Sequence, residues 1–120
     1  MQLIAGVLVV VVAALHVYFL FLEMFLWTTP FGRRTFGMTA DFAQSTRTLA
    51  ANQGLYNGFL AGGLIWGLAA YGVHGGRAVL TFFLACVVIA GIFGGVTVSR
   101  RILLVQALPA IAAAGFVWLA

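Results

Sequence analysis

The stretch Leu3–Trp27, LIAGVLVVVVAALHVYFLFLEMFLW, decides the fold because Glu23 is the one charged side chain in it. A helix that crosses a bilayer needs about 20 mostly apolar residues. No basic region precedes this run, and the run is too long for the apolar core of a signal peptide. We therefore interpret it as a retained first membrane span that ends at an interfacial aromatic, Trp27, followed by a helix-stopping Pro30.

Composition places the whole chain in the same class. The sequence has 120 residues, is 64% hydrophobic, and carries six basic and two acidic side chains. A soluble domain is about one quarter charged, so this balance is typical of an integral membrane protein. All six basic residues are arginines that fall between apolar runs and form no stripe, which excludes nucleic acid as a partner.

The pattern predicts an all-α, four-helix transmembrane bundle that forms a single domain over residues 1–120. Thr39 is a plausible N-cap for the second helix, and the helical pattern then continues for about 48 Å, which exceeds the thickness of a bilayer core. The first part of this helix is therefore expected to extend beyond the membrane. The predicted spans cover about 3–27, 49–71, 78–98 and 102–120, with a possible helical extension over 40–48.

The arginines also predict an orientation. With four spans, loops one and three share a side and hold five arginines, whereas the opposite side holds Arg77. The positive-inside rule then places loops one and three in the cytoplasm and both termini outside.

Polar side chains within the predicted spans lie at a similar depth, in the cytoplasmic half of the bundle. Glu23 and His16 are seven residues apart and share one helix face. An ionisable group in hydrocarbon is costly unless it faces protein, a partner or water, so Glu23 should turn inward toward the amides of the second span. His16 and Glu23 lie about 10.5 Å apart along the helix axis, too far to share a metal ion without other ligands. The remaining polar residues at this depth are Asn52, Gln53, Tyr56, Asn57 and Gln106.

Gly54, Gly58 and Gly62 form a series of small residues on a neighbouring face of the second span. Such a series permits close helix contact, either inside the bundle or at the seam of a homodimer. Both alternatives stay open at the level of sequence.

The segments HVYFLFLEMFLW (16–27) and LAANQGLYNGFLA (49–61) resemble the DUF1304 family of small bacterial membrane proteins. The resemblance runs from end to end and implies a multi-pass protein of the bacterial plasma (inner) membrane. The family has no assigned activity, so the resemblance implies no reaction and leaves cofactors unknown.

The leading functional hypothesis is a membrane-embedded site that binds a small apolar or lipid-like molecule, or acts on it by acid–base chemistry. One alternative is a proton-coupled transporter that works as a homodimer, and another is a structural or accessory subunit. In the leading hypothesis the roles are Glu23 as acid or base, His16 as its proton partner or orienter, Asn52, Gln53, Asn57 and Gln106 as ligand-positioning groups, and Trp27 and Tyr56 as pocket walls.

Overall fold

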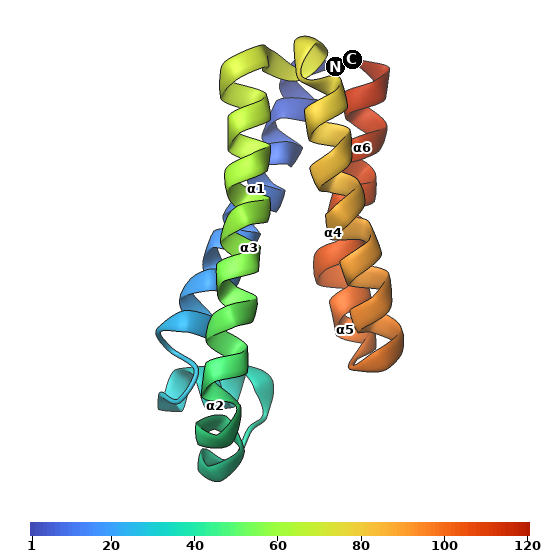
Figure 1. Cartoon of the computed structure of the whole chain (residues 1–120). Coiled ribbons are helices and arrows are strands. Elements are labelled where there is room, and N and C mark those ends of the chain that lie inside the picture. The colour runs from blue at the N-terminus through green and yellow to red at the C-terminus, as the bar shows by residue number, and fades with distance from the viewer. The chain divides into compact units, whose positions relative to one another are not determined.

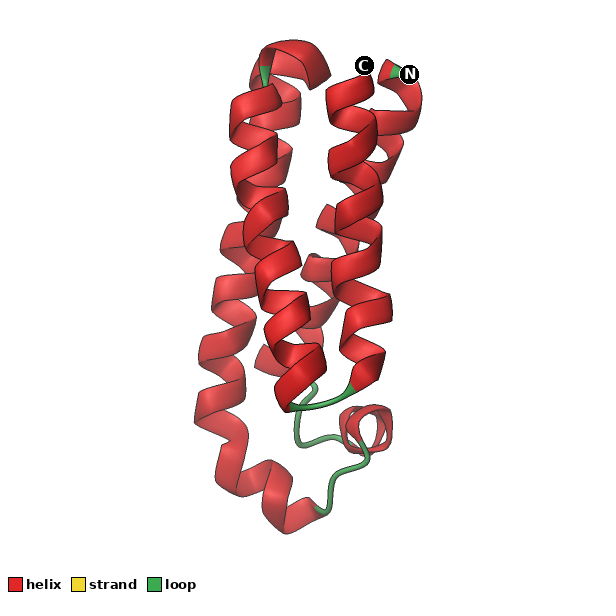
Figure 2. Cartoon of the chain, turned by 90° about the vertical axis from the view of Figure 1, so that its right-hand side faces the viewer, coloured by secondary structure: helices red, strands yellow, loops and turns green.

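The structure, a computed structural model, describes residues 1–120 and contains helices joined by short turns, with no β-strand (Figures 1 and 2). The prediction of an all-α fold is confirmed. The elements are α1 (Gln2–Met24), α2 (Pro30–Phe36), α3 (Ala40–Gly75), α4 (Arg77–Thr97), α5 (Arg100–Ile102), a π-helix η1 (Leu103–Ala107) and α6 (Leu108–Leu119).

Three helical segments are long and apolar enough to cross a membrane. They are α1, α4 and the continuous segment Arg100–Leu119 made of α5, η1 and α6. Helix α3 is longer than any of them but does not belong to this group, because its polar first half, its amides and its many glycines lower its hydropathy. The fourth span and the orientation of the termini therefore stay predictions.

Thr39 caps α3 as the sequence predicts, since its Oγ1 accepts a hydrogen bond from the backbone N–H of Phe42 at 3.1 Å. The helix then breaks at Gly72, where φ is +74° and ψ is 180°. A left-handed φ of this kind is strained for residues with a side chain, so glycine is the residue that permits the bend. The last turn of α3 follows the bend and leads into α4.

The chain divides into two compact units. The first consists of residues 1–14 and 60–120, and the second of residues 15–59. The buried core of the first unit is aliphatic and comes from α1, α3, α4 and α6, with Val9, Leu64, Leu80, Leu84, Val87 and Val117 fully buried.

Glycines bring α4 against η1 inside the first unit. A Cβ on Gly91 would lie 2.7 Å from the backbone nitrogen of Ala107, and a Cβ on Gly95 would lie 2.2 Å from the side chain of Leu103. Contacts this short leave room for hydrogen but not for a methyl group. The π-helical turn ends at Ala107, two residues before Pro109, which has no backbone N–H to donate to the preceding turn.

We expect Gly91→Val to lower the free energy of unfolding by about 2 kcal/mol, because the backbone of Ala107 cannot move aside. Gly115→Val is the matched control, since a Cβ there meets nothing within 4 Å. Thermal unfolding in detergent, followed by circular dichroism, measures both. Equal stability of the two variants would show that α4 and η1 do not pack at this distance.

The segment after α1 differs from the prediction. Helix α1 ends at Met24, and Pro30 does not stop a helix but occupies the first turn of α2. Thr29 Oγ1 caps α2 by accepting the N–H of Gly32 at 3.2 Å, and donates to the carbonyl oxygen of Leu26 at 2.6 Å. Thr-Pro is a helix-start signal when threonine is the N-cap and proline follows it, so the prediction of Pro30 as a helix stop is wrong.

Candidate functional site

A direct polar contact joins α1 and α3 in the second unit. The side-chain amide of Asn57 donates a hydrogen bond to Glu23 Oε1. Asn57 is 4% exposed. Glu23, the second-last residue of α1, is only partly buried. The predicted inward turn of Glu23 toward an amide of α3 thus has a specific partner, and the carboxyl keeps some accessible surface.

Two glycines of α3 allow this contact. A Cβ on Gly54 would lie 2.6 Å from Met24 Cγ and 3.1 Å from Glu23 Cβ, and one on Gly58 would lie 2.7 Å from Leu20 Cδ1. Both glycines therefore pack within the chain against α1. A Cβ on Gly62 meets nothing within 4 Å, so this third glycine takes no part in that packing. A homodimer through the glycine series stays a prediction.

Trp27 lies just beyond α1 and joins three elements of the second unit. Its indole Nε1 donates to Thr46 Oγ1 of α3 at 3.0 Å. Its ring lies 5.0 Å from that of Phe36, the last residue of α2. Trp27 therefore holds α2 and the start of α3 next to the end of α1, one turn away from Glu23.

The other predicted residues of α3 do not join the contact with Glu23. Asn52, Gln53 and Tyr56 are all exposed, and Tyr56 retains 52% of its surface. At 100° per residue, Asn52 is turned about 140° from Asn57, so one neighbouring helix cannot contact both. The structure brings Asn57 to Glu23 and leaves these three side chains outside that contact.

His16 is fully buried, and its ring stands edge-on to Phe19 at 5.4 Å between centroids. It occupies α1 two turns before Glu23, as the spacing requires. Gln106 lies in η1 of the first unit and is half-buried.

Sequence reasoning missed Thr46, Phe36 and Gly32, which complete the surroundings of Trp27. Gly32 is buried, and a Cβ there would lie 1.9 Å from the carbonyl oxygen of Leu26. Helix α2 thus packs directly on the backbone that follows α1. The available signal was the Thr29-Pro30 pair, which starts a helix at this point.

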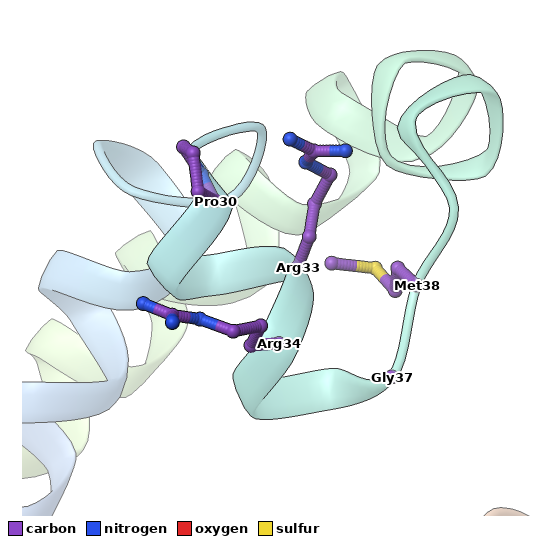
Figure 3. Close-up of a pocket in the computed structure, with 5 residues that line it drawn as sticks. All are labelled: Pro30, Arg33, Arg34, Gly37 and Met38. Carbon is purple, nitrogen blue, oxygen red and sulfur yellow. The ribbon is translucent and has the colours of Figure 1, made fainter.

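A shallow hollow of about 350 Å³ borders α2 on its outer side (Figure 3). Pro30, Arg33, Arg34, Gly37 and Met38 line it. The two arginines extend from different sides of the helix, and Arg33 lies on the side of Met38. This hollow is separate from the Glu23–Asn57 contact.

Comparison with known proteins gives a family and no activity. The profile of DUF1304, described as a protein of unknown function, matches residues 10–118. The chain is also 29% identical over 108 residues to the uncharacterized protein YpaA of Lactococcus lactis subsp. lactis strain IL1403, covering 88% of this chain and 89% of that protein. No solved structure matches. Since the profile spans nearly the whole sequence and includes both segments that form the Glu23–Asn57 contact, the chain belongs to the DUF1304 family.

Proposed function

We propose that this chain is a multi-pass membrane protein with four spans, in which residues 49–71 of α3 form the crossing that hydropathy alone does not detect. Support comes from the packing of Leu20 and Glu23, in candidate span α1, against Gly54 and Gly58 of α3. A helix that contacts a membrane span at this depth lies in the membrane with it. The glycines and the buried Asn57 account for its lower hydropathy.

Within this scaffold, Glu23 and Asn57 form a binding site for a small apolar or lipid-like molecule that carries one hydrogen-bonding group. The observation behind this proposal is that Asn57 fixes Oε1 of a carboxyl that remains partly exposed. A pocket that binds apolar molecules needs only a few well-placed polar groups to orient them. A fixed, reachable carboxyl meets this need, and an acid–base step on the bound molecule would use the same group.

A structural role is the second candidate, and the same hydrogen bond favours it. An amide that bonds directly to a carboxyl across two closely packed helices stabilises their register without any ligand. The two functions differ in what Glu23→Gln does. Glutamine keeps the length of the side chain and a carbonyl oxygen for Asn57, but removes the acid.

Native mass spectrometry of protein purified in mild detergent tests the proposal. We expect the wild type to carry a bound lipid-like molecule and Glu23→Gln to lose it by at least about tenfold in occupancy, equivalent to about 1.4 kcal/mol. Asn52→Ala is the control, since this amide is exposed on another face of α3, and it should retain the molecule. Circular dichroism should show all three proteins folded.

Two results contradict a binding function of the Glu23–Asn57 contact. One is retention of the molecule by Glu23→Gln at the occupancy of the wild type. The other is a wild type that carries no molecule while Asn57→Leu is strongly destabilised, which assigns the contact to structure alone.

A further inference from the structure

Helix α2 and the turn after it have an unbalanced positive charge. Arg33 and Arg34 lie in α2, and the segment 30–38 contains no acidic residue. The acidic residue before it, Glu23, is bound by Asn57, and the next one, Asp41, begins α3 and is exposed. The two guanidinium groups are therefore available to an external anion.

Arg33 carries a more specific indication. Its Nε atom is buried and has no hydrogen-bond partner. A buried donor without an acceptor is costly, and native structures satisfy nearly all such groups. Nε itself has no accessible surface, so an acceptor that enters the open hollow bordered by Arg33, Pro30, Gly37 and Met38 approaches the outer end of the guanidinium group (Figure 3). Phosphate oxygens suit a guanidinium, which binds them through parallel N–H donors.

Exposed aromatic side chains on α2 indicate that the hollow lies near lipid. Phe31 and Phe36, both in α2, are 46% and 44% exposed. The helix begins six residues after candidate span α1 ends at Met24, with Trp27 between them. Exposed aromatic rings and arginines directly after a membrane span are typical of the headgroup layer. The phosphate available at that level belongs to phospholipids.

We propose that the hollow on α2 binds the phosphate of an anionic phospholipid, with Arg33 as the main ligand and Arg34 as a second positive group on the other side of the helix. Phe31 and Phe36 hold α2 at the level where the lipid headgroups meet the acyl chains. This site is distinct from the Glu23–Asn57 contact, and either can exist without the other.

Lipid exchange tests the site. The wild type is incorporated into nanodiscs of mixed phosphatidylglycerol and phosphatidylcholine, released in the mass spectrometer, and scored for the lipids that remain bound. We expect retained phosphatidylglycerol to exceed its share of the mixture. Arg33→Gln should reduce this preference about fivefold, the effect of removing about 1 kcal/mol of attraction, and Arg34→Gln should reduce it by less.

Arg47→Gln is the matched control, because Arg47 is an exposed arginine of the same unit that does not line the hollow. It should keep the preference. An equal loss in all three variants would overturn the site, since it would show general charge attraction. Displacement of the retained lipid by soluble glycerol phosphate at millimolar concentration would also overturn it, because the ligand would then be a free anion.

Arg33→Lys tests the shape of the site. Lysine keeps the charge but lacks the planar guanidinium fork. Loss of the phosphatidylglycerol preference in this variant supports a shaped phosphate site, and full retention contradicts recognition by the guanidinium group.

Discussion

Replacing Asn57 with leucine is expected to lower the free energy of unfolding by about 3 kcal/mol, the largest effect of any amide substitution in α3. Leucine has the branching and the heavy-atom count of asparagine, but it is larger and cannot donate to Glu23 Oε1, so the carboxyl is left without its partner. Removing one member of a partly buried polar pair leaves part of the desolvation penalty of the other uncompensated. Thermal or denaturant unfolding in detergent measures the loss.

The double variant Glu23→Leu with Asn57→Leu separates this cause from simple damage to packing. With both polar groups gone, no unpaired carboxyl remains, and stability should return to within about 1 kcal/mol of the wild type. Asn52→Leu, on the exposed face of α3, should change stability by no more than about 0.5 kcal/mol. A double variant as unstable as Asn57→Leu alone would mean that the two side chains are not partners.

Gly32→Ala is the second large effect, and it concerns the docking of α2. The added methyl group would lie 1.9 Å from the carbonyl oxygen of Leu26 and 2.8 Å from its carbonyl carbon. Both are backbone atoms that no rotamer change can move, so we expect a cost of about 3 kcal/mol against the docked position of α2. Undocking exposes the backbone around Arg33 and Arg34 to trypsin.

Limited proteolysis in nanodiscs measures this opening. When opening is fast relative to cleavage, the cleavage rate follows the population of the open form, so 3 kcal/mol corresponds to about a 100-fold faster cut after these arginines. Gly62→Ala is the control because its Cβ meets nothing, and its cleavage should match the wild type. Wild-type cleavage rates in Gly32→Ala would show that α2 does not pack on Leu26.

The helical fold class was predictable because the length and the hydropathy of the apolar segments follow directly from the amino-acid sequence. The cap at Thr39 was predictable for a similar reason, since capping is local. Helix α2 was not predicted, because the proline in Thr29-Pro30 can mark either the end of one helix or the start of the next. The choice between them depends on packing of Gly32 against the turn after α1, a tertiary contact that the sequence does not display.

The candidate site was likewise predictable only in part. Spacing along one helix correctly placed His16 and Glu23 two turns apart, but depth alone could not tell which amide of α3 meets Glu23. Asn52 and Asn57 lie about 7.5 Å apart along the helix axis and about 140° apart around it, and the rotation decides which of them faces α1. The rotation of α3 is set by Gly54 and Gly58, whose missing side chains let α1 approach from the side of Asn57.

Asn57, and not Asn52, meets Glu23 across the two helices, and thiol crosslinking distinguishes these two pairings. In a Cys86→Ala background, the pair Glu23→Cys with Asn57→Cys is compared with Glu23→Cys plus Asn52→Cys, using a short bifunctional thiol reagent in native membranes. We expect rapid intramolecular crosslinking of the first pair and little in the second. Crosslinking of the second pair at an equal or higher rate would place another face of α3 against α1 and contradict the site.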